Sequence, residues 1–332
     1  MLDLSTLWDV PPGTMPQPME HTGYNNELYR VDAGDRQLVL RVYGNHANSK
    51  YIQHELSIVY QLQACGLPFQ VPAPVLTRRN EMWTVWSDER AKKLMVLLPF
   101  IRGHNPSATD LAQAEASGEA LGMLLDAMAA ITNNMRGLTG TQPVTEINRV
   151  HPLVPDAFEA MNTLGTLVPK PVKARVNAIL EHIYEDTRRM VKTLPQQLTH
   201  GDFINGNLLV EGAHVTGVLD FENSAINPRV MDLAIAIDTW SWDAQGTGNE
   251  WPRIDALAKG YARVSKLSTV EIDAIPSLIL LRNASVLMHL VGRFLSNTTP
   301  YVDVEQWIEA MLHVDAWLTM NREKLKECVG KA

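Results

Sequence analysis

Cysteine is scarce in this chain, with only Cys65 and Cys328 among its 332 residues. So few thiols exclude a disulfide framework, and their spacing matches no metal-binding motif. Positive charge is also in the minority: 29 Lys and Arg stand against 37 Asp and Glu, which gives a net charge of −8. An acidic chain is a poor candidate for binding nucleic acid or an anionic membrane, and we expect neither partner.

Targeting and membrane-spanning segments are lacking as well. The first ten residues, MLDLSTLWDV, have neither the basic region nor the apolar region of a secretory signal. The most apolar late stretch, 275–291, is interrupted by Arg282 and Asn283. We therefore expect it to be too short and too polar for a transmembrane helix. Together these absences predict a cytoplasmic protein.

The first hundred residues carry the patterns of β-strands. Runs 28–31 and 37–43 are rich in residues that favour strands, and the Asp-Ala-Gly-Asp segment 32–35 between them predicts a hairpin turn. Two more strand-like runs follow at 82–86 and 94–100. These patterns indicate a mostly antiparallel sheet in this part of the chain.

One helix is expected between these strands, capped by Ser49 and stopped by Gly66. Its apolar positions recur at spacings of 4, 3 and 3 along one face: Ile52, Leu56, Val59 and Leu62. Glu55 lies on or beside that face, where a carboxylate is costly unless it is paired. Arg41, in the strand before the helix, is its natural partner. The alternative is that the two residues are unrelated, with both charges in solvent.

Beyond residue 103 the pattern becomes helical. Helices are expected at 109–132, 155–161, 170–192, 230–238, 251–264, 269–295 and 304–328, around a strand–loop–strand segment at 198–220. The length of the chain exceeds what one hydrophobic core usually supports. We therefore expect an α+β fold of two lobes: residues 1–101, a mostly antiparallel sheet with one helix, and residues 102–332, mostly helical.

Three oxygen-bearing side chains fall into loops of segment 198–220. Asp202 and Asn207 are separated by four residues, and Asp220 follows a small apolar run suited to ending a buried strand. Phosphoryl transfer needs a carboxylate that orients and deprotonates a hydroxyl, and oxygen ligands that hold Mg²⁺ on the nucleotide. The spacing matches the catalytic loop and metal-binding Asp of protein kinases. The alternative is a polar turn in which these side chains only cap the strands.

The motif His200-Gly201-Asp202 has Gly where protein kinases have Arg, and it resembles the aminoglycoside phosphotransferase and choline kinase superfamily. Within that superfamily, the run DLAIAIDTW at 232–240 is most similar to the homoserine kinase branch. The resemblance runs through nearly the whole chain, with its specific motifs in 198–240. It implies a bilobal protein-kinase-like fold and an ATP- and Mg²⁺-dependent kinase for a small-molecule hydroxyl.

The same resemblance assigns roles to the motif residues. Asp202 would be the catalytic base or hydroxyl-orienting group, and Asn207 and Asp220 would be the Mg²⁺ ligands. His200 and Asp232 would support the catalytic loop structurally and take no part in the chemistry.

Residues 1–101 would bind the nucleotide. Segment 22–26 is positioned to cover the phosphates, although an ordinary Gly/Asn turn has the same composition. Arg41 stands where the family often has Lys, and Arg presents a planar fork in place of a point charge. Pro99-Phe100-Ile101 would be the hinge whose backbone meets adenine. The expected nucleotide-binding residues are Gly23, Asn25, Asn26, Arg41, Glu55, Pro99, Phe100 and Ile101.

The acceptor implied by the resemblance is a homoserine-like amino acid or another amino alcohol. Glu222, in place of the Gly of protein kinases, argues against protein substrates. Acidic and aromatic side chains after the motifs would suit an ammonium group. The candidate acceptor residues are Asn205, Glu222, Asp238, Trp242 and Asp243.

Several alternatives stay open from sequence. The chain could be an antibiotic kinase with a wide, acidic cleft, or a nucleotide-binding pseudokinase with a regulatory role. Trp240 and Trp242 could be core or cleft-wall residues rather than substrate contacts. The C-terminal helices could form a lid over the pocket or the face of a homodimer.

Overall fold

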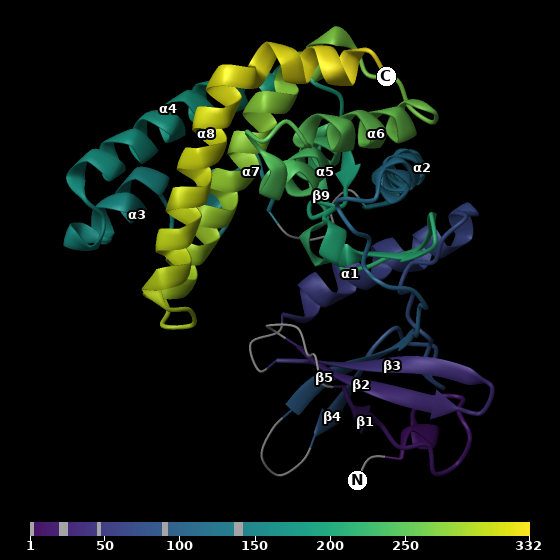
Figure 1. Ribbon diagram of the computed structural model, residues 1–332. Coiled ribbons are helices and arrows are strands. Elements are labelled where there is room, and N and C mark those ends of the chain that lie inside the picture. The colour runs from purple at the N-terminus through teal and green to yellow at the C-terminus, as the bar shows by residue number, and fades with distance from the viewer. Residues whose placement is uncertain (1–2, 20–25, 45–47, 88–91, 136–141) are drawn as a thin grey trace.

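The computed structural model describes residues 3–19, 26–44, 48–87, 92–135 and 142–332. It has two lobes, a sheet with one long helix and a larger helical part, as Figure 1 shows. The bilobal α+β fold predicted from the sequence is therefore confirmed.

The first lobe is built on a five-stranded antiparallel sheet in the order β1-β2-β3-β5-β4. Its strands are β1 (Gln17–Pro18), β2 (Asn26–Ala33), β3 (Arg36–Tyr43), β4 (Thr84–Ser87) and β5 (Lys92–Pro99). The predicted first hairpin is present, with Ala33 paired to Arg36. Its turn is shorter than expected because only Gly34 and Asp35 lie between the strands, and Gly34 takes the left-handed φ of 70°.

Helix α1 (Ser49–Leu62) lies between the sheet and the helical lobe (Figure 1). Asn48, and not Ser49 as predicted, caps it: the Asn48 side chain accepts the Lys50 N–H at 2.9 Å. The predicted apolar face is buried, and it packs in one core with residues of the helical lobe. The His54 ring also lies 3.0 Å from the Ser224 carbonyl, which ties α1 to the catalytic region.

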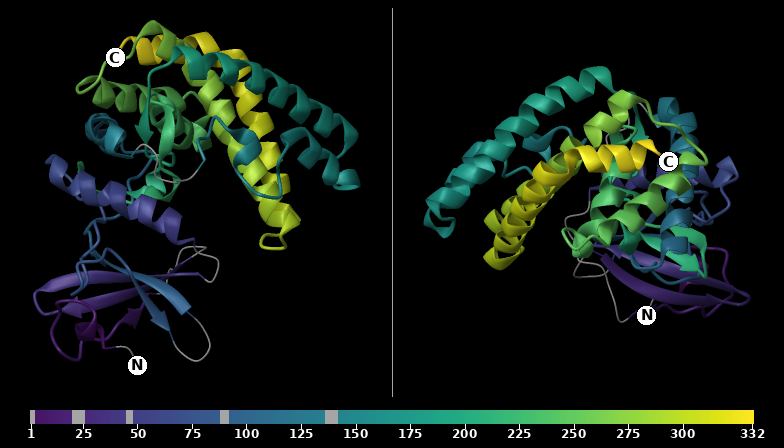
Figure 2. Two further views of the ribbon diagram at one scale, coloured as in Figure 1. Left: turned by 180° about the vertical axis from the view of Figure 1, so that it is seen from behind. Right: turned by 45° about the horizontal axis from the view of Figure 1, so that its top comes forward.

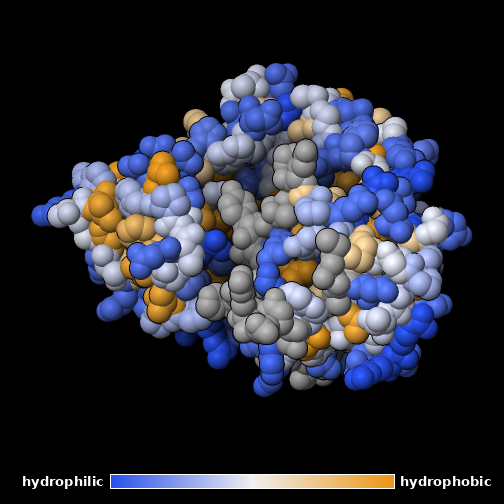
Figure 3. All heavy atoms as spheres, turned by 90° about the horizontal axis from the view of Figure 1, so that it is seen from below, coloured by the Kyte–Doolittle hydropathy of each residue, from blue (hydrophilic) through white to orange (hydrophobic). Residues whose placement is uncertain are grey.

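The second lobe is mostly helical, and α4 packs on α7 and α8 to form an arm on one side (Figure 2). Its helices are α2 (Leu111–Met135), α3 (Ala157–Thr163), α4 (Lys170–Thr193), α5 (Met231–Ser241), α6 (Glu250–Ala262), α7 (Thr269–Leu295) and α8 (Tyr301–Gly330). Seen from below in Figure 3, apolar residues form separate patches among hydrophilic ones.

The second lobe also contains two two-stranded sheets. Strand β6 (Gln196–Thr199) pairs with β9 (Ala225–Pro228), and β7 (Leu208–Glu211) pairs with β8 (His214–Val218). The sequence analysis expected the segment that holds β6, β7 and β8 but not β9. These four strands hold the two loops that carry Asp202 and Asp220.

Helix α7 spans 27 residues and is apolar enough, by length and composition, to cross a membrane. The sequence-based reasons for excluding a span, that the stretch is too short and too polar, are therefore wrong. However, 78% of its most apolar window is buried inside the protein, as expected for a core helix.

Candidate active site

The catalytic loop is anchored by Asp232, a fully buried residue in the first turn of α5. The backbone N–H groups of His200 and Gly201 donate to the two Asp232 carboxylate oxygens at 2.6 and 2.8 Å. Burial raises the pKa of Asp232, while these donors and His200 oppose the shift. The carboxylate thus fixes the backbone just before Asp202.

His200 connects Asp202 to the strand that leads to Asp220. Its Nδ1 accepts the Asp202 backbone N–H at 3.2 Å, and its Nε2 lies 2.9 Å from the Leu219 carbonyl. With Nδ1 accepting this N–H, Nε2 is the ring nitrogen placed to donate to the Leu219 carbonyl. Both nitrogens of the His200 ring therefore have a backbone partner, and the ring holds the catalytic loop next to the strand that precedes Asp220.

Gly201 has a left-handed φ of 80°, and a Cβ atom on it would lie 2.3 Å from the Asn223 carbonyl oxygen. Both the backbone conformation and the lack of space favour glycine at this position. The close approach brings the segment after Asp220 against the catalytic loop.

Asp202 has partners on both carboxylate oxygens. Asn207 Nδ2 donates to Oδ2 at 3.1 Å and to the Asp202 backbone carbonyl at 2.9 Å. Arg282 Nη2, from α7, donates to Oδ1 at 2.5 Å in an ion pair whose side chains are 20% and 15% exposed. The sequence analysis missed Arg282 as a site residue. The signal was present, because a charged residue interrupts an otherwise apolar helix there.

Asp220 has φ 64° and ψ 70°, a left-handed conformation that few non-glycine residues adopt. Residues held in such regions often lie at functional sites. Glu222 lies close by: burial, and then the charges of Asp220 and Glu55, raise the pKa of Glu222 to about 7. The loop after β8 therefore places two carboxyl groups close together beside the catalytic loop.

The fit to a magnesium ion can be judged from Asn207 and Asp220. The Asn207 carboxamide nitrogen is taken by Asp202, so its oxygen is the atom that can serve a metal ion. Within the described residues no group of three or more His, Cys, Asp or Glu could hold a metal ion. Mg²⁺ on a nucleotide, however, typically uses one or two protein ligands and completes its octahedron with phosphates and water. The residues present fit that donor set.

The first lobe contributes a buried ion pair. Arg41 Nη1 donates to Glu55 Oε1 at 2.7 Å, and the Tyr43 hydroxyl donates to the other oxygen at 3.4 Å. Burial raises the pKa of Glu55, and the Arg41 charge opposes this. The expected pairing of Arg41 with Glu55 is therefore present, and Asp220 is near enough to influence both charges.

Among the three residues of the expected hinge, one backbone N–H remains that can donate to an adenine ring. Pro99 has no N–H, and the Phe100 N–H donates to the Gln37 carbonyl at 3.0 Å. Of the three predicted hinge residues, Ile101 is thus the one whose N–H can meet an adenine ring. The predicted phosphate loop cannot be described in full: Gly23 and Asn25 lie outside the described residues, and Asn26 begins β2.

Three of the predicted acceptor residues lie together on α5 and the turn after it. Buried Asp238 accepts from Asn283 Nδ2 at 2.8 Å, and burial raises the pKa of Asp238 to about 6. The Trp242 ring lies edge-on to His313, and Asp243 pairs with Arg253 at 2.5 Å. None of the three lines the pocket at Asp202.

Asn205, the fourth predicted acceptor residue, lies in the catalytic loop between Asp202 and Asn207. Its backbone carbonyl accepts from Asn105 Nδ2 at 3.3 Å. Its buried side-chain oxygen has no hydrogen-bond partner in the part of the chain that the structure describes. Such an atom is costly to leave unmatched, which makes it a candidate to meet a ligand or water.

A pocket of about 310 Å³ opens at Asp202, between the catalytic loop, the loop after β8 and α7. Its polar lining residues include Asp202, Glu222, Asn223, Arg282, Ser285 and His289. Glu222 is the predicted acceptor residue that the structure brings next to Asp202.

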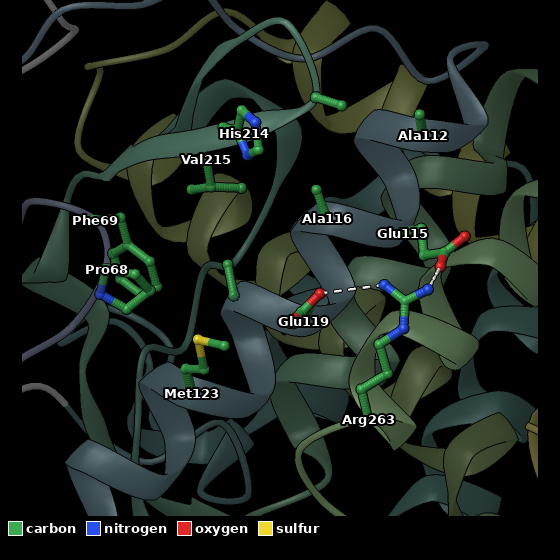
Figure 4. A pocket seen from close by; sticks show the side chains of 12 residues that line it. Pro68, Phe69, Ala112, Glu115, Ala116, Glu119, Met123, His214, Val215 and Arg263 are labelled. Atoms are coloured by element: carbon green, nitrogen blue, oxygen red, sulfur yellow. Dashed lines mark hydrogen bonds and ion pairs between the residues drawn. The ribbon is translucent and has the colours of Figure 1, made fainter.

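A larger pocket of about 620 Å³ lies along α2 and β8, and its lining includes no residue of the catalytic loop (Figure 4). Small and apolar residues of α2 face Phe69 there, and Arg263 pairs with Glu115 and Glu119 at its edge. Size alone does not make it the active site, since Asp202, Asn207 and Asp220 do not line it.

Comparison with known proteins supports the same reading of the motifs. A family model described as the phosphotransferase enzyme family matches residues 21–267. A homoserine kinase of Zymomonas mobilis is 26% identical over 265 residues, which cover 80% of this chain and 76% of that protein.

Solved structures share the fold. A microcompartment-associated aminopropanol kinase superposes with a TM-score of 0.71 at 17% identity, covering 97% of both chains. A spectinomycin phosphotransferase in complex with ADP and spectinomycin has a TM-score of 0.63 at 14% identity, covering 95% of this chain and 96% of its own.

Proposed function

We propose that the acceptor of this chain is a homoserine-like hydroxy amino acid or a small amino alcohol. The chain belongs to the phosphotransferase enzyme family and is an ATP-dependent kinase for a small-molecule hydroxyl group. The observation that supports this most directly is the joint placement of Asp202 and Asn207 on one loop, linked through His200 to the strand before Asp220.

The proposed reaction is an in-line transfer. The acceptor oxygen forms a bond to the γ-phosphorus of ATP, the bond between that phosphorus and the β–γ bridging oxygen breaks, and ADP leaves. The acceptor proton passes to an oxygen of Asp202. Arg41, held by Glu55, would pair with the nucleotide phosphates, and the Ile101 N–H would meet adenine.

Magnesium would be held by Asn207 and Asp220, and it would neutralise charge on the phosphates. The chain's own contribution is to place those two oxygens. Asn207 is fixed by its bonds to Asp202. Asp220 has a left-handed backbone conformation, which few residues other than glycine adopt and which sets the direction of its side chain.

The pocket supports a small acceptor. About 310 Å³ is near the lower end of the size range of ligand pockets. It also carries both signs of charge, with Asp202 and Glu222 beside Arg282, whereas an aminoglycoside acceptor predicts a wide and strongly acidic cleft. A cytoplasmic location, and a lid or homodimer face made by the C-terminal helices, stay predictions from the sequence.

The test is release of ADP from Mg-ATP across a panel of homoserine, choline, small amino alcohols, sugars and aminoglycosides. We expect turnover on a small hydroxy amino acid or amino alcohol. In Asp202→Asn we expect kcat to fall by about 10²- to 10⁴-fold, because an aligned base typically contributes that factor.

The other outcomes identify the alternatives. Turnover only on aminoglycosides or other antibiotics would make the chain a resistance kinase. Mg-ATP binding without turnover on any acceptor would indicate a pseudokinase. No nucleotide binding at all would contradict the proposed function.

A further inference from the structure

Resting on the proposed function, we infer that Arg282 binds a carboxylate of the acceptor, and that its release from Asp202 is what frees the catalytic oxygen. The acceptor is then a hydroxyl compound that carries an anionic group, as a hydroxy amino acid does. An amino alcohol without such a group would be a poor substrate.

The pocket wall formed by α7 presents Arg282 with matching neighbours. Ser285, Val286 and His289 follow Arg282 by three, four and seven residues, so they lie on one face of the helix. All four line the pocket at Asp202. One helix face therefore supplies a cation, a hydroxyl and an imidazole to the same space.

Arg282 uses only part of its donor capacity in the structure. Its Nη2 donates to Asp202, but its Nε is buried and has no hydrogen-bond partner among the described residues. A buried donor without a partner is costly, so this N–H is a position where a ligand atom gains binding energy. Guanidinium presents parallel N–H groups that match the two oxygens of a carboxylate.

His289 supports an anion at this wall without supplying charge itself. Its ring lies edge-on to His151, with 5.9 Å between centroids. Burial first, and then His151, Arg293 and Arg282, lower the pKa of His289 to about 4. The ring is therefore neutral near pH 7, and among the described residues that line this pocket Arg282 is the cation.

The same pocket also holds groups that suit an ammonium. Glu222 and Asp202 line it from the two loops, and Asp202 is paired with Arg282 in the structure. A small zwitterion would thus find acidic groups and Arg282 within one small pocket. This arrangement distinguishes a hydroxy amino acid from an amino alcohol, which can use only the acidic groups.

Through its ion pair, Arg282 also determines which carboxylate oxygen of Asp202 is available to the acceptor hydroxyl. In the structure it occupies Oδ1 of Asp202, while Asn207 occupies Oδ2. An acceptor hydroxyl needs one of these oxygens within hydrogen-bond reach. A carboxylate that takes Arg282 would release Oδ1, whereas an acceptor without an anion would leave Asp202 engaged.

Three acceptors test the need for the carboxylate and the need for the amine separately. Homoserine has the hydroxyl, the amine and the carboxylate; 3-aminopropan-1-ol lacks the carboxylate, and 4-hydroxybutanoate lacks the amine. For the wild-type protein we expect kcat/KM for homoserine to exceed that for 3-aminopropan-1-ol by about 10- to 100-fold, since a charge-assisted contact is at stake.

Substitutions of Arg282 should reverse that preference. In Arg282→Met, KM for homoserine should rise by about 10- to 100-fold. Turnover of 3-aminopropan-1-ol should become faster, because Asp202 is released. Arg282→Lys should recover part of the homoserine KM. Arg263→Met, on the edge of the pocket in Figure 4, is the control arginine and should leave all three acceptors unaffected.

Each result decides the question. A loss of equal size on homoserine and 3-aminopropan-1-ol in Arg282→Met, with the melting temperature unchanged, would give Arg282 a purely structural role and overturn the inference. Equal wild-type kcat/KM on these two acceptors would overturn the inference and leave the kinase intact. Absence of turnover on every acceptor of the wider panel would overturn the proposed function, and the inference with it.

Discussion

At the scale of single residues, the site is organised by charges that are buried and matched. Asp232 takes two backbone N–H groups, Glu55 takes Arg41, and Asp202 takes Arg282 and Asn207. A buried carboxylate without such partners would be neutral or destabilising. Each pairing therefore fixes the position of one element of the site.

Asp238 gives a residue-scale prediction on pH. Burial raises the pKa of folded Asp238 to about 6, against 3.8 for the ordinary carboxyl. Between these values the folded protein binds more protons than the unfolded chain, so stability falls as pH rises and is level above about 6. Asp238→Asn removes this decline.

The measurement is urea unfolding at pH 4 and pH 7 for both proteins. Relative to the wild type, the unfolding free energy of Asp238→Asn should be higher at pH 7 than at pH 4 by on the order of 2 kcal/mol. Asp255→Asn, whose carboxylate forms an exposed pair with Lys259, is the control and should show little change between the two pH values. A pH-independent difference for Asp238→Asn would mean that its carboxyl has an ordinary pKa.

At the scale of elements, close helix packing sets the frame of the second lobe. Helices α2 and α6 approach closely at Gly118 and Gly260. An added Cβ on Gly118 would lie 2.0 Å from the Leu257 carbonyl oxygen, and one on Gly260 would lie 1.8 Å from that of Glu115. Backbone atoms cannot yield as a flexible side chain can, so glycine is needed at both positions.

Gly260→Ala should therefore destabilise the protein by about 1–3 kcal/mol or more, because the two helices must separate to admit a methyl group. Thermal unfolding followed by circular dichroism measures the effect. Gly330→Ala is the matched control, since its added Cβ would meet only the side chain of Ile272 at 3.6 Å. Equal melting temperatures for the two variants would show that α2 and α6 can adjust without cost.

At the scale of the whole molecule, the proposed function requires the two lobes to act together on one nucleotide. Arg41 and the hinge belong to the first lobe and its border, whereas Asp202, Asn207 and Asp220 belong to the second. The His54–Ser224 contact and the shared core at α1 join them. A nucleotide with its metal ion would add a further link, because it would be held from both sides.

Mg-ATP should therefore stabilise the whole chain. At a ligand concentration of about 100 times Kd, the gain in unfolding free energy should be about 2.7 kcal/mol, seen as a higher melting temperature. We expect EDTA to remove most of this gain, and Asp220→Asn to lose the magnesium-dependent part while it keeps a weaker response to ATP alone. An equal shift with and without Mg²⁺ would contradict the assignment of Asp220 as a metal ligand.

The sequence by itself determined the parts that depend on local patterns. Strand runs around Gly34, the apolar face of α1 and the periodic helices are short-range signals, and the structure agrees with them in type. The motif containing Asp202, Asn207 and Asp220 is likewise compact along the chain. Element ends shifted by one or a few residues, because capping at Asn48 and fraying are decided by individual hydrogen bonds.

Only the tertiary structure decided which distant residues meet. Arg282 lies 80 residues after Asp202, and no local pattern links them, yet α7 brings them into contact. The same packing directs Asp238 toward Asn283 and away from the pocket at Asp202, although sequence proximity to the motifs had grouped it with the acceptor residues. Side-chain direction on a helix depends on which neighbours cover each face, and those neighbours come from elsewhere in the chain.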